Sequence, residues 1–279
     1  MQVAMSLDQA HVVVIGGGFV GQMIQLSIPR ARLLDWRKTP PENHLETRIG
    51  PQYLWEPIPD VSSESFVVTT LVDGVPPTDA SILAYKKKIG KEHDGGDWGL
   101  QFRHITTGWN SKLPVPRVEY GCHVEDVDLS GHTLYLRDAR QIHYDILINT
   151  IPLDFFLKLC TVPPRVHSPW KQDAIYMAIR AHDRSADNPA MTLNYISDPA
   201  APWYRITTSS GQEFLESLHP LSAAKKLPMG KIHTHPESED VLRKLAVHDC
   251  YCFGRFATWR PDELAHGTWR FICNWKEQM

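Results

Sequence analysis

Short hydrophobic runs alternate with polar and glycine-rich turns along this chain. The first run, residues 11–15, is largely apolar and breaks directly into the pattern G-x-G-x-x-G at residues 16–21. A run of this length predicts a buried parallel strand, and the glycines predict the turn into a helix over residues 19–28, which Pro29 ends. The next apolar run, residues 31–34, predicts a second strand.

The glycine turn has the residue order that binds dinucleotides. Gly16 allows a tight turn, Gly18 lets the backbone approach a pyrophosphate, and Gly21 lets the helix pack on the strand. Asp35 stands nineteen residues after Gly16, at the expected tip of the second strand, where adenosine ribose hydroxyls need an acceptor. The alternative is a chance glycine cluster followed by an ordinary surface aspartate.

The rest of the pattern predicts further strands and helices. Residues 66–72 predict a strand that ends in the turn Asp73-Gly74, and Asp79 is the expected N-cap of a helix over residues 80–89. Three alternating stretches, residues 118–128, 133–137 and 141–144, predict a small antiparallel meander. Later elements are expected as strands at residues 145–149, 204–208 and 250–254, and as helices at residues 153–159, 241–247 and 261–275.

Strands and helices therefore alternate at both ends of the chain, with antiparallel material between them. This layout predicts an α/β protein, in which a nucleotide-binding domain with a parallel sheet and a small meander is interleaved with a reduced substrate domain. The expected nucleotide-binding domain comprises residues 1–60, 115–160 and 245–279, and the substrate domain comprises residues 61–114 and 161–244.

Composition narrows the class of protein. The 279 residues are 42% hydrophobic and 22% charged, as in an ordinary globular protein, and a net charge of −3 gives no sign of a surface for nucleic acid or membrane. No run approaches the roughly 18–20 apolar residues that cross a bilayer, and the first residues do not have the pattern of a signal peptide. Five cysteines without regular spacing favour reduced thiols and a cytoplasmic location.

Two pairs of metal-ligating residue types stand two positions apart, His233 with His235 and Cys250 with Cys252. Neither has the spacing of a known metal motif, and no carboxylate completes a set. Thiols in an apolar run are common core residues, so the sequence predicts no metal site.

Several separated segments resemble one superfamily of flavoproteins, the one that contains amine oxidases, protoporphyrinogen oxidase and UDP-galactopyranose mutase. Residues 15–21 resemble its FAD pyrophosphate loop, and residues 35–37 resemble its ribose-binding strand end. Gly50-Pro51-Gln52 is similar to a Gly-Pro-His segment near the flavin of the mutases, with Gln52 in place of the histidine. Residues 144–153 are similar to the strand that returns to the cofactor domain. Residues 230–232 and 253–260 are similar to the mutase C-terminal signature.

The resemblance implies that the dinucleotide is FAD and that the nucleotide-binding domain is a Rossmann-like FAD-binding domain. An arginine directly after a glycine at a strand end, Arg255, is able to reach a pyrophosphate as a bidentate donor, although a surface salt bridge is the alternative. The expected cofactor-binding residues are Gly16, Gly18, Phe19, Val20, Gly21, Asp35, Trp36, Arg37, Gly50, Val124, Thr150, Gly254, Arg255, Glu263 and Leu264.

A flavin carries its own reactivity, so the protein needs to supply orientation and electrostatics rather than a nucleophile. Aromatic and basic residues from the middle of the chain are the expected substrate contacts: His104, Trp109, Tyr204 and Arg205. The competing interpretation is that His104 is a hydrogen-bonded structural residue and that Trp109 belongs to the core.

The resemblance implies an FAD-dependent oxidoreductase that oxidises a C–N bond of an amine or amino-acid-derived group. A more specific version follows compact phage-encoded flavoproteins that hypermodify thymine in DNA, acting in the host cytoplasm on an amino-acid adduct of the base. The acidic net charge does not support DNA as a partner. The alternatives are a mutase-like sugar-nucleotide isomerase and a non-catalytic FAD-binding sensor or scaffold. The oligomeric state stays open.

Overall fold

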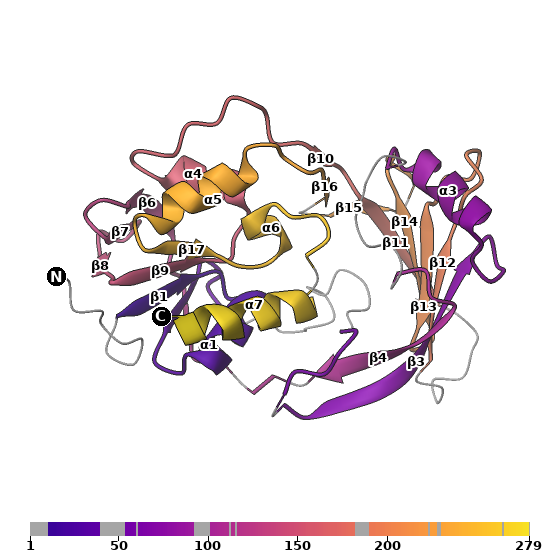
Figure 1. Ribbon diagram of the computed structural model, residues 1–279, viewed down its shortest axis with the longest axis horizontal. Helices are drawn as coiled ribbons and strands as arrows, with labels where there is room; N and C mark the ends of the chain where they lie inside the picture. The colour runs from indigo at the N-terminus through magenta and orange to yellow at the C-terminus, as the bar shows by residue number, and fades with distance from the viewer. Residues whose placement is uncertain are drawn as a thin grey trace.

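The computed structural model describes residues 11–39, 54–59, 61–91, 101–111, 113–114, 116–181, 190–222, 224–227, 230–263 and 265–278. Two lobes lie side by side in Figure 1, each built around its own sheet. Mixed α/β structure with a parallel sheet and separate antiparallel strands confirms the predicted fold class.

A five-stranded parallel sheet is the centre of the first lobe. Its strands run in the order β17 (Cys250–Cys252), β9 (Ile146–Asn149), β1 (Val12–Ile15), β2 (Arg32–Asp35) and β5 (Val118–Tyr120). Each neighbouring pair is parallel. The chain order of these strands places the two ends of the protein in one sheet. All residues of β1 and β9 are buried, as expected where helices or a second layer cover both faces.

Alternate residues of β1 face two different layers. Val12 and Val14 pack with residues of α1 (Phe19–Ser27) and α7 (Ala265–Gln278). On the opposite face, Val13 and Ile15 pack with residues of α4 (Leu153–Leu159), α5 (Ser238–Ala246) and a three-stranded antiparallel sheet. Figure 1 shows α1 and α7 on one side of the parallel sheet and α4, α5 and α6 (Arg255–Thr258) on the other.

The predicted meander is shorter than expected. Its strands are β6 (Val124–Asp128), β7 (Thr133–Leu136) and β8 (Gln141–His143). Gly121 has a φ of +74°, a conformation that breaks the expected first strand in two. The part before Gly121 is β5, which pairs in parallel with β2, so that part of the prediction is wrong.

A seven-stranded sheet forms the second lobe. The order is β15 (Lys225–Lys226), β11 (Tyr176–Ala181), β14 (Gln212–Ser217), β13 (Arg205–Ser209), β12 (Met191–Tyr195), β3 (Ser63–Val72) and β4 (Ile105–Ser111). Only β12 and β3 pair in parallel; the other pairs are antiparallel. Helix α3 (Asp79–Lys88) covers this sheet through Tyr85, which packs on Phe102 and Tyr195.

Two short strands lie between the lobes, β10 (Gln172–Asp173) and β16 (Lys231–Ile232), as Figure 1 shows. The pattern of the sequence did not predict them, nor β4, β11, β12, β14, β15 and α6. The predicted N-cap of α3 is also wrong by one residue: Thr78 caps the helix in a reciprocal capping box with Ser81, and Asp79 is the first helical residue.

Within the described residues, no helix combines the length and the apolar character that a bilayer crossing requires. The same residues contain no group of three or more histidine, cysteine, aspartate or glutamate side chains arranged to hold a metal ion. All five cysteines are free thiols, and burial raises the pKa of Cys252 to about 12.

Candidate cofactor and substrate site

The glycine turn between β1 and α1 is held by close packing at two of its glycines. Gly16 has a φ of +108°, and a Cβ atom there would lie 2.4 Å from the Thr150 hydroxyl oxygen. At Gly21, a Cβ atom would lie 2.0 Å from the carbonyl oxygen of Gly16. The roles of tight turn and close helix packing expected for Gly16 and Gly21 therefore have a direct steric basis.

Gly18 differs from these two glycines because the space around it is open. A Cβ atom at Gly18 would meet no atom within 4 Å. Gly18 is the N-cap of α1, and no side chain described in the structure caps the helix. The first-turn N–H groups, including those at Phe19 and Val20, therefore face an accessible position where the helix dipole favours an anion. This geometry fits a pyrophosphate.

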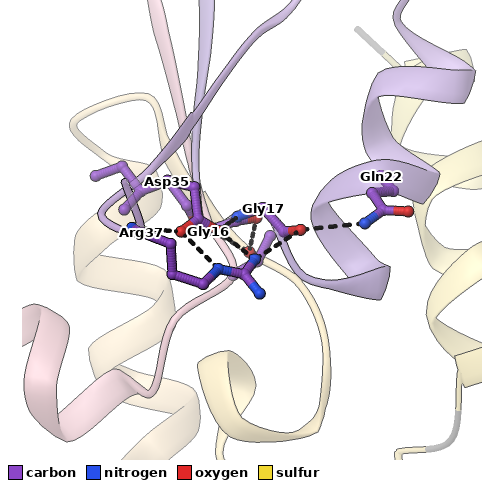
Figure 2. Close-up of polar contacts among 7 residues, drawn as sticks. Gly16, Gly17, Gln22, Asp35 and Arg37 are labelled. Carbon is purple, nitrogen blue, oxygen red and sulfur yellow. Dashed lines mark hydrogen bonds and ion pairs between the residues drawn. The ribbon is translucent and has the colours of Figure 1, made fainter. Parts of the chain in front are cut away.

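Asp35, at the end of β2, is only 4% exposed and faces the glycine turn (Figure 2). Its Oδ2 accepts hydrogen bonds from the Gly17 N–H at 2.9 Å and from Arg37 Nη2 at 2.5 Å. Its Oδ1 accepts from the Arg37 N–H at 2.8 Å and from Arg37 Nε at 2.9 Å. Figure 2 also shows Arg37 and Gln22 reaching the Gly17 carbonyl oxygen. Ribose hydroxyls bound by Asp35 would have to exchange with some of these donors.

Three other predicted cofactor residues lie around this turn. The Thr150 hydroxyl, at the end of β9, is within donating distance of the carbonyl oxygens of Ile15 (2.9 Å) and Gly16 (3.0 Å). Thr150 therefore holds the turn in place. Trp36 is 63% exposed and makes an edge contact with His123, and Val124 at the start of β6 packs on the core.

The C-terminal segment closes on the first turn of α1. Gly254 has a φ of +91°, and a Cβ atom there would lie 2.9 Å from Val20 Cγ2. The N–H of Gly254 donates to Glu263 Oε1 at 3.0 Å. The structure thus brings together two predicted cofactor-binding segments that are more than two hundred positions apart in the sequence.

Glu263 is a buried carboxylate that the chain's own donors surround. Besides Gly254, Thr268 donates to Oε1 at 2.7 Å and Thr258 donates to Oε2 at 2.5 Å. These contacts give the Glu263 side chain a structural role in joining α6 to α7. Its backbone carbonyl oxygen accepts a hydrogen bond from Arg255 Nε at 3.3 Å.

Arg255 is half-buried at the start of α6. Among the described residues it forms no ion pair, so the surface salt bridge weighed as an alternative is not made there. Burial lowers the pKa of the Arg255 guanidinium, and the positive charge of Arg205 lowers it further. Because Arg205 belongs to the seven-stranded sheet, this repulsion shows that the two lobes bring cationic groups toward each other.

Two predicted substrate contacts, Tyr204 and Arg205, meet at one buried carboxylate. Glu216 on β14 is 4% exposed; its Oε2 accepts a short hydrogen bond from the Tyr204 hydroxyl. Its Oε1 accepts from Arg205 Nε at 3.0 Å and from Arg205 Nη2 at 2.5 Å. Burial raises the pKa of Tyr204 well above its usual value, and the nearby Glu216 charge acts in the same direction. Arg205, the first residue of β13, is therefore fixed in place.

The other two predicted substrate contacts lie elsewhere. His104 is an exposed residue just before β4, and its Nδ1 lies 3.1 Å from the Thr70 carbonyl oxygen. Trp109, on β4, packs against the core cluster that contains Leu54 and Ile58. These contacts favour the structural interpretation of both residues. Two predicted cofactor residues, Gly50 and Leu264, lie outside the described residues, as does the Gly50-Pro51-Gln52 segment.

Two residues of this site were missed as site residues, Glu216 and Lys231. Lys231 Nζ lies 3.9 Å from the centroid of the Tyr204 ring, next to Arg205. The sequence held one weak signal for Glu216, a single carboxylate within the otherwise uncharged residues 214–218. Nothing in the sequence pattern predicts that β16 brings Lys231 to Tyr204.

No protein family model matches this chain, and no curated protein matches it. Solved structures do match. One is the crystal structure of reduced UDP-galactopyranose mutase, with 12% identity and a TM-score of 0.51, covering 93% of this chain and 93% of that chain. Another is a fatty acid isomerase from P. acnes that produces CLA, with 11% identity and a TM-score of 0.53, covering 97% of this chain and 99% of that chain.

The match to the mutase confirms the predicted resemblance at the level of the fold. This chain therefore shares the fold of these two proteins, with a Rossmann-like parallel sheet and an added antiparallel sheet.

Proposed function

We propose that this chain is an FAD-dependent oxidoreductase that oxidises the C–N bond of an amine or an amino-acid-derived group. One observation carries the proposal: Gly254, from the far end of the chain, packs on Val20 in the first turn of α1, while the space around the N-cap Gly18 stays open, and Arg255 of the same segment is within electrostatic range of Arg205 of the second lobe. The division into an FAD-binding domain and a substrate domain is part of the proposal.

The residues present fit FAD best at its pyrophosphate. The N–H groups of the first turn of α1 would bind the phosphate oxygens, and the absence of any atom near a Gly18 Cβ position leaves room for them. Asp35 would accept from the adenosine ribose, and Arg255 would add a positive charge from the closing segment. When bound, the flavin supplies a hydride acceptor.

The charged groups of Arg205, Glu216 and Arg255 suit a substrate that carries both an amine and a carboxylate. Arg205 and Arg255 offer guanidinium donors, which bind carboxylates bidentately. Glu216 holds Arg205 in one orientation, so less side-chain entropy is lost when a carboxylate binds.

Two substrates of this chemistry are distinguished by size. A free amino acid would need only the charged groups that bind its amine and carboxylate, whereas an amino-acid adduct on thymine in DNA would also need a basic groove for the phosphates. The net charge of −3 favours the small substrate, and DNA carrying the adduct is the second arm of the test.

Isomerisation without net oxidation is the second candidate. The two matching structures with TM-scores of 0.51 and 0.53 are both named for isomerisations, one a mutase and one a fatty acid isomerase. An isomerase would turn over its substrate without leaving the flavin reduced. A sensor or scaffold would bind FAD and turn over nothing.

The test is anaerobic titration of the purified protein, followed by its absorbance spectrum. We expect a yellow protein whose flavin bands are bleached by amino acids or by DNA bearing an amino-acid adduct. A yellow protein that no amine bleaches would contradict amine oxidation and leave the isomerase or scaffold. A colourless protein that binds NADP in preference to FAD would overturn the cofactor assignment.

A matched pair of arginine variants sharpens this test. Arg205 and Arg180 each pair with a glutamate of β14, but Arg180 lies at the exposed surface. We expect Arg205→Gln to slow bleaching at least about tenfold, equivalent to about 1.4 kcal/mol, and Arg180→Gln to leave it unchanged. Equal effects of the two substitutions would contradict a role for Arg205 in binding the substrate.

A further inference from the structure

Strand β16 faces both lobes through its two residues. Ile232 is buried in the core between the parallel sheet and helices α4 and α5, together with Trp259 and Val241. Its neighbour Lys231 extends to the other lobe, where Nζ lies 3.9 Å from the Tyr204 ring centroid and 6.0 Å from the Tyr85 ring centroid. Because side chains alternate along a strand, Lys231 lies at the junction of the lobes, where Figure 1 shows β16.

The backbone that carries Lys231 is fixed. Lys231 pairs with Asp173 in the antiparallel register of β16 and β10. A Cβ atom at Gly230, the preceding residue, would lie 1.8 Å from the Asp173 carbonyl oxygen. Such close contact of the two backbones requires glycine at position 230 and leaves Lys231 little freedom of position.

The charged groups that face Lys231 do not neutralise it. They are Arg205, Glu216, Lys91 and Asp173. Glu216 is already bonded to Arg205 and Tyr204, and Asp173 lies 2.8 Å from His233 Nε2. Among the described residues, Nζ has no hydrogen-bond acceptor or ion-pair partner, and it lies over the Tyr204 ring.

This environment lowers the pKa of Lys231. Burial lowers the pKa of Lys231 to about 7, and the positive charge of Arg205 is the next cause. An exposed lysine has a pKa of about 10.4, so almost none of it is the neutral amine at neutral pH. A neutral amine at the junction of the lobes is able to act as a base.

We propose that Lys231 takes up the proton of the substrate's ammonium group. This inference rests on the proposed amine oxidation. The neutral Lys231 amine accepts one proton from the ammonium, which leaves a neutral substrate amine and a lysine ammonium. A bound flavin would supply the acceptor for the hydrogen of the α-carbon, taken as hydride with its two electrons, and the freed nitrogen lone pair would form the C=N bond. Lys231 finally releases its proton to water, so two electrons and one proton are accounted for.

The other candidate bases are less suitable. Glu216 already accepts from Tyr204 and Arg205, and removing one of those donors would leave a buried group unpaired. His104 is exposed beside β4, at the far edge of the seven-stranded sheet from β11 and β15.

The first test measures the ionisation of Lys231 without flavin or substrate. Trace acetic anhydride is applied to the folded protein between about pH 5 and about pH 10, and acetylation of each lysine is read by mass spectrometry. We expect the reactivity of Lys231 to rise with a midpoint near 7, about three pH units below the usual value for an exposed lysine, with the exposed Lys244 as the reference in the same sample. A shared midpoint for the two lysines would overturn the inference, whatever the reaction of the protein.

The second test measures the pH dependence of anaerobic flavin reduction by the best amine. In the unaltered protein the rate should rise with pH through about 7. Lys231→Met keeps the aliphatic stem, and we expect it to lose this rise and to react at least about a hundredfold more slowly. Lys244→Met is the matched control and should keep both. A Lys231→Met protein with the normal pH profile would refute the role of Lys231 while leaving the proposed function intact.

Discussion

The glycine turn at residues 16–21 and the cluster of Arg205, Glu216 and Lys231, called here the junction cluster, are built by opposite means. In the glycine turn, the important groups are backbone atoms and missing side chains: Gly21 touches the Gly16 carbonyl group, and Gly18 leaves space. In the junction cluster, the important groups are long side chains, Arg205, Glu216 and Lys231, that come from separate strands. The proposed cofactor site is thus formed by residues close together in the sequence, whereas the proposed substrate site is formed by residues that only the pairing of the strands brings together.

The largest effect should come from adding one carbon atom to the glycine turn. Gly21→Ala would place a Cβ atom 2.0 Å from the Gly16 carbonyl oxygen, a backbone atom that cannot turn away. We expect the free energy of unfolding to fall by about 3 kcal/mol, measured by urea denaturation. The control is Gly267→Ala, because a Cβ atom at Gly267 meets nothing within 4 Å. Equal stability of the two variants would show that α1 does not pack on the turn as described.

Breaking the junction cluster should be the next largest effect. Glu216→Ala leaves the Tyr204 hydroxyl and the Arg205 guanidinium without their acceptor in a largely buried place. We expect a loss of about 2–3 kcal/mol. The exposed pair of Glu125 and Arg137 provides the comparison, since Glu125→Ala should cost less than about 0.5 kcal/mol. Similar losses in both variants would mean that the Glu216 carboxylate is solvated rather than buried.

The sequence predicted most of the first lobe and little of the second. The β1-α1-β2 unit, β9 and β17 were recognised because apolar runs, glycines and Pro29 are local signals. The meander was misread at Gly121, since a parallel partner for β5 lies in β2, far away in the sequence. Strands β11 and β12 were not predicted for the same reason, because each depends on a partner strand that the local sequence does not reveal, β14 for β11 and β3 for β12.

The site residues follow the same division. Gly16, Gly21 and Asp35 were found from spacing, and the structure gives each a definite contact at the turn. Glu216 was missed because a glutamate in a strand is usually solvent-facing, and only the pairing of β13 with β14 brings it to Arg205. A sequence does not display that pairing.

A smaller loss of stability should follow from disturbing the contact between Gly254 and Val20, which come from opposite ends of the chain. Gly254→Ala combines a φ of +91° with a Cβ atom 2.9 Å from Val20. Gly74→Ala is matched for backbone, with a φ of +80°, but a Cβ atom there meets nothing within 4 Å. We expect a loss of about 1–2 kcal/mol at Gly254 and a smaller loss at Gly74. A greater loss at Gly74 would argue against packing of the closing segment on α1.

The smallest effect concerns an ion pair between two strands of the parallel sheet. Glu119 on β5 accepts two hydrogen bonds from Arg32 on β2, and these lower the pKa of Glu119. A lowered pKa means that the stabilisation is present above the usual glutamate value and is lost as the pH falls through the lowered one. Because both side chains are about one-third exposed, we expect only about 0.5 kcal/mol.

The comparison of Glu119→Gln with the unaltered protein checks this expectation. Urea denaturation at about pH 7 should show the unaltered protein to be slightly more stable, and the difference should vanish at about pH 3. A difference that grows on acidification would contradict the stated sign.

The central claim is that the open face at Gly18 receives the pyrophosphate of FAD. The most direct measurement is the equilibrium binding of FAD to Gly18→Val and to Gly267→Ala, with both unfolding free energies measured alongside. The positions resemble each other in that a Cβ atom at either one meets nothing within 4 Å, so neither change should unfold the protein. We predict that Gly18→Val weakens FAD binding at least about tenfold, equivalent to about 1.4 kcal/mol, and that Gly267→Ala does not change it. Equal FAD affinity in Gly18→Val and the unaltered protein would contradict the account.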